Sequence, residues 1–395
     1  MDIMKLIDSE KIRVWRRHMH KYPEVGFNER ETSNYIAAEI AANFPDVELI
    51  RFDDKVNAET FPNYGLIAVL KGGKPGKALA MRADFDALPM KEDTDLEFKS
   101  VHENVAHTCG HDCHAAMLLG AMDALYKIKD ELEGHVLFIF QHAEEALPGG
   151  AQAIIDSGVF KDYDIKAFYA SHVFPSDKVG VIKFSPGSVT ANSDLAGIEI
   201  EGKGGHGSMP EKCIDTVLVG TEVVQALNYI VSRNVSAFNN AVISIGRFSA
   251  GTVANIIPHT AEIMVTVRSR DSETRDLIER RINEITQNIC AAYGATCKVE
   301  YKRGYTSIIN DDDLCKTFSN IVAETLPDLE IKANDPLMGG EDFSAFKAIA
   351  PTLFVGLGAM PASGEFYVNH HPKFEINEDV LPLGTALYVA FATKM

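Results

Sequence analysis

The chain has 395 residues, 46% of them hydrophobic, and a formal net charge of −18. This length exceeds what one hydrophobic core usually supports, so we expect two domains. The acidic charge repels polyanions and argues against a nucleic acid partner. The opening residues lack the basic-then-apolar order of a signal peptide, and no apolar run is long enough to span a bilayer. The six cysteines are few and irregularly spaced, which favours reduced thiols and a cytoplasmic protein.

The first part of the chain combines helical and β-type patterns. Residues 10–44 have apolar positions at helical spacing, interrupted at Pro23 and Gly26, and this predicts two helices. Two β-type runs at residues 66–70 and 78–82 lie on either side of the turn-forming sequence KGGKPG. They predict a hairpin or a pair of adjacent strands.

Strands and helices then alternate. A helix is predicted from residue 114, a strand at residues 136–140, a helix at residues 151–158 that ends at Gly158, and a strand at residues 165–170. Such alternation is typical of an α/β sheet covered on both faces.

The pattern changes near residue 189. Alternating strands such as AGIEIEG and AEIMVTVRSR are accompanied by long helical stretches at residues 216–232 and 272–293, which predicts a smaller α+β domain. After residue 303 the α/β alternation resumes, with a helix near residues 313–326 and the strand TLFVGLG. We therefore expect residues 1–188 and 303–395 to form one α/β domain and residues 189–302 to be inserted into it.

Four clusters of metal-ligand side chains stand in loops or near strand ends. The sequence HTCGHDCH at residues 107–114 combines a thiol, imidazoles and a carboxylate, although a helix N-terminus capped by Asp112 is an alternative. Glu144 and Glu145 follow the strand at residues 136–140, where open α/β sheets place their ligands.

The remaining two clusters are single histidine positions. His172 follows another apolar strand, and His370 lies far down the chain in VNHHPKF. Each histidine alone would more often be structural. Four such clusters on one predicted sheet favour a metal site over coincidence.

Ordered fragments along nearly the whole chain resemble the M20 metallopeptidase family, in its aminoacylase, hippurate hydrolase and auxin-conjugate amidohydrolase branch. These fragments are RADFDALPM, HTCGHDCHAAMLLGA, QHAEE, SHV, GKGGHGSMP, ANIIP, GGEDF and HHPKF. The resemblance implies a larger α/β catalytic domain with a central mixed sheet, into which a smaller α+β, ferredoxin-like lid and dimerisation domain is inserted.

The resemblance also implies the site. Two divalent metal ions share it, with Zn²⁺ expected and Mn²⁺ or Co²⁺ also suited to these donors. The ligands that carry over are Cys109, His111, Glu145, His172 and His370. Glu144 matches the catalytic acid/base, and Asp86 matches an acidic residue that orients a ligand. Asp84 stands where the wider family has a ligand histidine, so its role is open, and His371 is an alternative to His370.

Further residues of the inserted domain match substrate contacts. By resemblance, His206 in GKGGHGSMP reaches the active site of a partner subunit and steadies the oxyanion, which implies a homodimer or a dimer-based oligomer; a solvated loop histidine is the simpler alternative. Asn255 and Arg268, on an expected strand pair, match residues that contact the substrate and its carboxylate. The GGEDF motif resembles a loop that closes the site, but its glycines also suit a turn.

Together these features predict a metal-dependent amidohydrolase for small N-acyl amino acids, in which Glu145 binds metal and Glu144 moves the proton. Alternative amide substrates are dipeptides, p-aminobenzoyl conjugates and N-acetyl-diaminopimelate. Cys109 as a nucleophile is a competing hypothesis, although it leaves the glutamates and distant histidines without a role. A metal-binding protein without catalysis is the non-enzyme alternative.

Overall fold

The computed structural model describes residues 2–52, 61–335 and 337–395, and this part of the chain divides into two compact units. The first unit contains the residues up to Val189 together with Ile308–Asp335 and Asp342–Met395. The second contains Thr190–Ser307 and the short segment that ends at Glu341. The expected division into domains at 188/189 and 302/303 stays a prediction.

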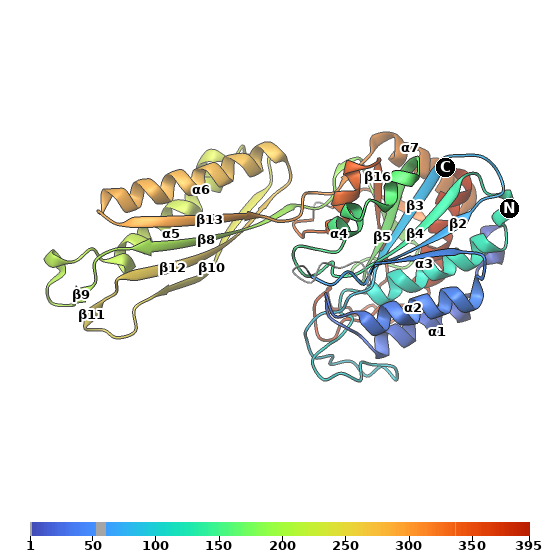
Figure 1. The fold of residues 1–395 in the computed structure, drawn as a ribbon, viewed down its shortest axis with the longest axis horizontal. Helices are drawn as coiled ribbons and strands as arrows, with labels where there is room; N and C mark the ends of the chain where they lie inside the picture. The colour runs from blue at the N-terminus through green and yellow to red at the C-terminus, as the bar shows by residue number, and fades with distance from the viewer. Residues whose placement is uncertain (1, 53–60, 336) are drawn as a thin grey trace. The chain divides into compact units, whose positions relative to one another are not determined.

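A mixed β-sheet forms the centre of the first unit, as the sequence predicted (Figure 1). Its main path runs β1-β2-β4-β3-β5-β16-β14-β7, with β6 beside β16 and β15 beside β6. Strands β4, β3, β5 and β16 are parallel neighbours, so their carboxyl ends point the same way. The strands are β1 (Glu48–Arg51), β2 (Leu66–Lys71), β3 (Ala78–Asp84), β4 (His135–Gln141), β5 (Ile165–Phe174), β6 (Val181–Lys183), β7 (Gly187–Ser188), β14 (Ile309–Asn310), β15 (Glu330–Lys332) and β16 (Thr352–Gly358).

The prediction that β2 and β3 pair with each other was wrong, because β4 lies between them. The KGGKPG segment does not form a tight hairpin turn. The Gly72 N–H donates to the carbonyl of Gly134, and the Lys74 N–H donates to that of Leu132. A Cβ at Gly72 would lie 2.2 Å from the Gly134 oxygen. These glycines therefore allow the backbone to pack against the segment that leads into β4.

Helices cover both faces of this sheet, which is why its strands are apolar on both sides. Alternate strand residues belong to different cores: Ala68 and Leu70 pack with the larger helices, whereas Ile67 and Val69 pack on the opposite face. The larger layer includes α1–α3, which Figure 1 shows together on one side of the sheet. Its helices are α1 (Ser9–Lys21), α2 (Arg30–Asn43), α3 (His111–Tyr126), α7 (Asp312–Thr325) and α8 (Val380–Lys394). The opposite layer contains α4 (Ala151–Asp156) and the 3₁₀ segments η3 (Val159–Asp162) and η5 (Asp342–Ala348).

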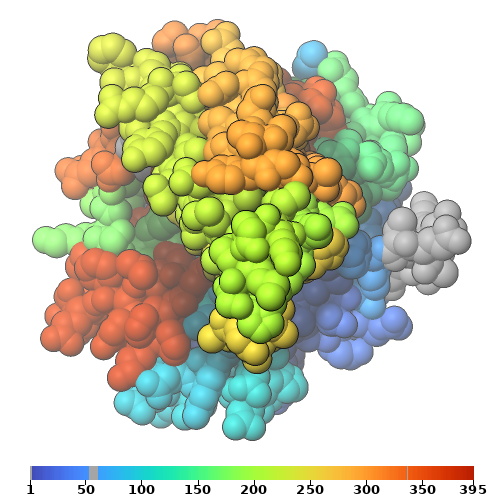
Figure 2. Space-filling view, turned by 90° about the vertical axis from the view of Figure 1, so that its left-hand side faces the viewer, coloured from blue at the N-terminus to red at the C-terminus, as the bar shows by residue number. Residues whose placement is uncertain are grey.

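The second unit has a β-α-β-β-α-β order. Its antiparallel sheet runs β10-β12-β8-β13, which is the ferredoxin-like arrangement. The elements are β8 (Asn192–Glu201), α5 (Thr216–Asn234), β10 (Ala241–Ala250), β12 (Thr260–Ser269), α6 (Ser272–Ala292) and β13 (Thr296–Arg303). Asp215 and Asp271 cap the two helices, which lie side by side (Figure 2). A separate small sheet pairs β9 (Gly205–His206) with β11 (Ile256–Ile257). A role as lid or dimerisation domain stays a prediction.

Within the described residues, no helix combines the length and apolar character needed to cross a membrane.

Candidate metal centre

The expected ligands of the first unit meet at the carboxyl ends of its parallel strands. Glu144 and Glu145 follow β4, as predicted. His172 lies inside β5, opposite Gly356, because this strand continues to Phe174; the prediction that His172 follows the strand was wrong. Gly110 adopts a φ of +94°, and a Cβ there would lie 2.4 Å from the Val173 side chain. Glycine therefore lets the loop before α3 lie against β5.

Side chains of ligand type converge at this edge of the sheet. In each of three groups of described residues, the donor atoms all lie within 4.8 Å of one another. The groups are Cys109, His111 and His172; Cys109, Glu145 and His370; and His111, Glu144 and Glu145. The Cys109 Sγ lies 3.4 Å from the His172 Nε2, and the His370 Nε2 lies 2.8 Å from a Glu145 carboxylate oxygen. The fold thus brings all five expected ligands together with Glu144.

Two of the imidazoles are oriented by a hydrogen bond on the nitrogen that faces away from the cluster. The His111 Nδ1 donates to the Asp86 carboxylate at 3.1 Å, and the His172 Nδ1 donates to the Val173 carbonyl at 2.9 Å. The Nε2 of each ring is then available to coordinate a metal ion. The His111 Nε2 is buried and has no hydrogen-bond partner among the described residues, as expected for a metal ligand.

Asp86 connects two of the expected ligands. One carboxylate oxygen accepts from His111, and the other accepts the backbone N–H of Glu145 at 3.0 Å. Burial opposes ionisation, but the hydrogen bond from His111, the charge of that ring and the N–H of Glu145 together outweigh it and lower the pKa of Asp86. This arrangement is that of a carboxylate which orients a ligand histidine.

His114 and Asp84 form a second oriented pair. The His114 Nδ1 donates to Asp84 at 2.6 Å, while its Nε2 accepts the N–H of Val173 at 3.0 Å. Both ring nitrogens are engaged, so His114 is not available as a ligand. Asp84 also accepts from Arg82 at 2.6 Å. Asp84, whose role the sequence left open, therefore anchors the histidine that holds β5 beside His172.

Asp342 of the GGEDF motif, to which no role had been assigned, is an internal anchor of the first unit. Its carboxylate accepts from the Arg82 guanidinium at 2.9 Å, from the Gln141 amide at 2.7 Å and from the Ala151 N–H at 3.0 Å. It thereby ties β3, β4 and α4 together, and its carboxylate lies within 4.8 Å of that of Glu144. Sequence reasoning missed Arg82 and His114, although both stand within the quoted motifs.

The electrostatics of the cluster favour a cation. Hydrogen bonds to Cys109 and Glu145 raise the pKa of His370 to about 10. Burial alone would lower the pKa of His111, but Asp84 and Cys109 outweigh it and raise that pKa well above its usual value. Burial raises the pKa of the Cys109 thiol, which is unlike the lowered pKa of a nucleophilic cysteine. A thiol, imidazoles and carboxylates in an electronegative, largely buried setting, with His370 on its exposed side, fit transition-metal ions.

His371 is held away from this cluster. Its Nδ1 accepts the N–H of Lys373 at 3.1 Å, and its ring stacks on Tyr367 with centroids 4.5 Å apart. Of the two adjacent histidines, His370 is therefore the one that joins the candidate ligands.

The remaining candidates lie in the second unit. His206, on β9, is exposed, and its Nδ1 accepts from the Ser208 hydroxyl at 2.8 Å. Arg268, on β12, donates to the Thr266 hydroxyl at 2.7 Å. Asn255 comes directly before β11, which pairs with β9, so the prediction that Asn255 and Arg268 share a strand pair was wrong. The local alternation of residues did not reveal that this short segment leaves the larger sheet.

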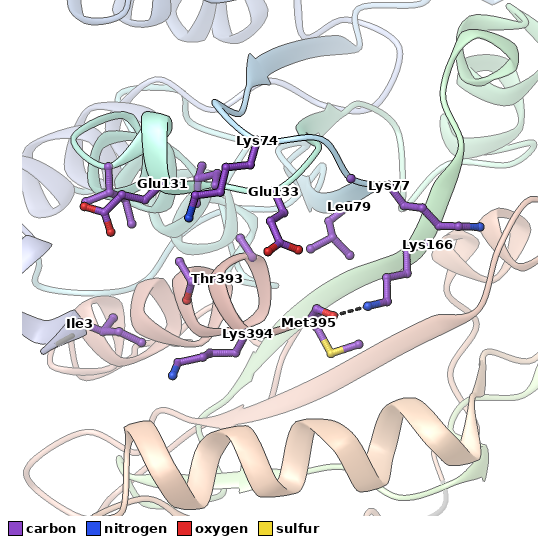
Figure 3. Close-up of a pocket in the computed structure, with 14 residues that line it drawn as sticks. Ile3, Lys74, Lys77, Leu79, Glu131, Glu133, Lys166, Thr393, Lys394 and Met395 are labelled. Atoms are coloured by element: carbon purple, nitrogen blue, oxygen red, sulfur yellow. Dashed lines mark hydrogen bonds between the residues drawn. The ribbon is translucent and has the colours of Figure 1, made fainter.

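A cavity of about 490 Å³ lies at the opposite ends of the same strands. Figure 3 shows Leu79, near the start of β3, and Lys166, near the start of β5, among its lining side chains. The cavity and the ligand cluster are thus on different edges of the sheet, so the cavity does not belong to the candidate metal centre.

The chain is similar to known proteins along nearly its whole length. The model of peptidase family M20/M25/M40 matches residues 80–394. The chain is 36% identical to a hippurate hydrolase of Campylobacter jejuni over 390 residues, covering 98% of this chain and 96% of that protein. It is 35% identical to an N-acetylcysteine deacetylase of Bacillus subtilis over 379 residues, covering 95% and 94%.

A solved structure agrees along nearly the full length. It is a dinuclear metal-binding peptidase of the M20 family from Bacillus subtilis, with a TM-score of 0.83 and 30% sequence identity. The match covers 98% of this chain and 97% of that chain.

Proposed function

The chain belongs to peptidase family M20/M25/M40 and is a hydrolase acting on amide bonds, and we propose that it removes the acyl group from small N-acyl amino acids. Two relatives are named for such substrates: hippurate, which is N-benzoylglycine, and N-acetylcysteine. The observation that carries the proposal is the convergence of Cys109, His111, Glu145, His172 and His370 beside Glu144.

We propose that these five side chains hold two divalent metal ions, with Zn²⁺ expected and Mn²⁺ or Co²⁺ as alternatives. When bound, such ions activate water at neutral pH and polarise an amide carbonyl. The protein supplies the orientation: Asp86 holds the ring of His111 and the backbone of Glu145. The Val173 carbonyl holds the ring of His172.

Glu144 is the proposed acid/base. It is buried beside Glu145, and its donor atom lies within 4.8 Å of those of His111 and Glu145. In this role its carboxylate takes a proton from the attacking water and delivers it to the departing amine nitrogen. The adjacent glutamates thus divide the work, since Glu145 binds metal while Glu144 moves the proton.

A substrate panel tests this function. Acetyl, benzoyl and longer-chain acyl amino acids are incubated with protein reconstituted with Zn²⁺, Mn²⁺ or Co²⁺, and the free amino acid is measured. Dipeptides, p-aminobenzoyl conjugates and N-acetyl-diaminopimelate belong in the same panel. Metal-replete protein that cleaves no acyl amino acid would reject the proposal.

The Glu144→Gln variant tests the acid/base role. Turnover is expected to fall by at least about a hundredfold, the usual scale for losing a general acid/base, with metal content unchanged. Glu103→Gln, at an exposed position, is the matched control. Near-normal turnover in metal-replete Glu144→Gln would exclude this role.

We further propose that Arg268 and Asn255 contact the substrate, with the planar guanidinium of Arg268 gripping its carboxylate. Arg268→Ala should raise KM about tenfold or more, since a hydrogen bond to a charged group contributes roughly 1.5–3 kcal/mol. Arg280→Ala, an exposed position on α6, serves as the control. An unchanged KM for Arg268→Ala would remove the support for this contact.

We also propose that the protein is a cytoplasmic homodimer. In this dimer, His206 of one subunit reaches the active site of the partner subunit. Support comes from the exposure of His206 on β9, where Ser208 orients its ring. Mixing two inactive variants, Glu144→Gln and His206→Ala, should restore about a quarter of wild-type activity if subunits of a symmetric dimer exchange at random. Failure of exchanged dimers to recover activity would place His206 outside the partner's site.

A further inference from the structure

Glu29 is a buried carboxyl group to which neither the motifs nor the ligand cluster give a role. It lies directly before α2 and has no exposed surface. Its Oε1 accepts the backbone N–H of Ala143 at 2.7 Å. Its Oε2 is buried and has no hydrogen-bond partner among the residues that the structure describes. Glu29 therefore ties its carboxyl group to the backbone of the residue that precedes Glu144.

Ala143 has a backbone conformation that alanine rarely adopts. Its φ is +50°, in the left-handed region that favours glycine. Such a conformation persists only when surrounding contacts enforce it, and these residues cluster near functional sites. The hydrogen bond to Glu29 is one such contact. Because Ala143 is adjacent to Glu144, its backbone angles set the direction in which the next side chains leave the chain.

The segment 143–145 is held at both ends by buried carboxyl groups. Glu29 accepts the N–H of Ala143, and Asp86 accepts the N–H of Glu145 at 3.0 Å. Glu144 lies between these two points. The loop before α2 also packs on this turn, since a Cβ at Gly26 would lie 3.0 Å from the Ala146 Cβ.

The raised pKa of Glu29 keeps its carboxyl group protonated and neutral near pH 7. Burial, reinforced by the negative charge of Asp86, raises the pKa of Glu29 to about 9. The protonated acid keeps an oxygen for the Ala143 N–H without adding a second negative charge beside Asp86. Glutamine has nearly the same shape and also offers a neutral oxygen, so it is the conservative substitution at this position.

We propose that Glu29 is a positioning residue for amide hydrolysis, which holds the turn at Ala143 so that Glu144 and Glu145 point into the metal centre. This inference rests on the proposed function for its kinetic consequence. Its effect on metal binding through Glu145 is independent of the substrate.

Three substitutions of Glu29 test the proposal. Glu29→Leu removes the acceptor and keeps the volume, Glu29→Asp shortens its reach, and Glu29→Gln preserves it. We expect Glu29→Leu to lower kcat at least tenfold with little change in KM, and to weaken metal affinity about tenfold to a hundredfold, as for other groups that support ligands. Glu29→Gln should keep both quantities within a fewfold of wild type. Glu31→Leu, at an exposed position on α2, is the matched control.

Metal affinity is measured by competition with a chromophoric chelator, and folding by thermal unfolding of each variant. Wild-type kcat and metal affinity in Glu29→Leu would overturn the proposal, and so would equal losses in Glu29→Gln and Glu29→Leu. If Glu29→Leu does not fold, Glu29→Asp decides: weakened metal binding supports the role, and wild-type values overturn it. If wild-type protein hydrolyses no N-acyl amino acid, the proposed function fails, whereas the metal affinities still decide the role of Glu29.

Discussion

Asn369 donates its side-chain amide to the backbone carbonyl of Cys109 at 3.0 Å. The same amide lies 3.3 Å from the carbonyl of Val173, and the backbone N–H of His370 donates to Thr108 at 2.8 Å. One side chain thus links three parts of the chain that each carry an expected ligand. A loop far along the sequence is held in place where its histidine can complete the cluster.

Asn369→Ala should weaken metal binding about tenfold to a hundredfold, because the loop that carries His370 loses its link to the other ligand segments. Chelator competition measures the affinity. Asn239→Ala, which removes an amide contact in the second unit, serves as the control. Unchanged metal affinity in Asn369→Ala would show that the backbone hydrogen bonds of this loop, including those to Thr108 and from Asp93, hold His370 in place without Asn369.

Asp84→Asn should destabilise the first unit by about 3–5 kcal/mol, since breaking a buried charge pair leaves the Arg82 guanidinium poorly compensated. The free energy of unfolding in urea measures this effect, with the exposed Asp95→Asn as the control. Metal affinity should also fall, because His114 no longer has an anionic partner. If the Asp84→Asn variant is as stable as wild type, then Asp342 alone compensates the charge of the Arg82 guanidinium.

Chelator treatment distinguishes a metal enzyme from a thiol hydrolase. EDTA should abolish hydrolysis, and adding back Zn²⁺, Mn²⁺ or Co²⁺ should restore it, since the site then regains its ions. Apparent metal affinity should fall on acidification, because thiol and imidazole ligands must lose their protons to bind. Activity that survives complete metal removal would favour Cys109 as a nucleophile.

Glu92 makes stability depend on pH. Burial opposes ionisation, but hydrogen bonds from His20, Thr94 and the Ser100 backbone outweigh it and lower the pKa of Glu92 from 4.5 to about 2. A carboxylate with a lowered pKa stabilises the fold above its unfolded pKa, and this stabilisation is lost as pH falls through the folded value.

Glu92→Gln should therefore unfold more easily than wild type near neutral pH, and the difference should shrink as pH falls from 4.5 towards 2. Urea denaturation across this range measures it. Glu97→Gln, at an exposed position nearby, should show no such pH dependence. A constant difference between Glu92→Gln and wild type at all pH values would contradict the ionisation of Glu92 as its cause.

Much of the fold follows from local patterns. The interruption at Pro23 and Gly26 separates α1 from α2, and the apolar run that becomes β4 predicts the strand that precedes Glu144. Thiol, imidazole and carboxylate side chains suit transition-metal ions, and the resemblance of the ordered motifs to the M20 family implied which of them are ligands, Cys109, His111 and Glu145 among them.

The sequence alone therefore determined the class of fold and the types of side chain available to the cluster, because periodicity and side-chain type are local properties. The tertiary structure decided that β4 separates β2 from β3, that His114 is an anchor rather than a ligand, and that Glu29 reaches Ala143. A histidine or a carboxylate is the same side chain whether it binds a metal ion or anchors a neighbouring segment. Which atom each one faces depends on residues up to hundreds of positions away, and only the folded chain brings those atoms together.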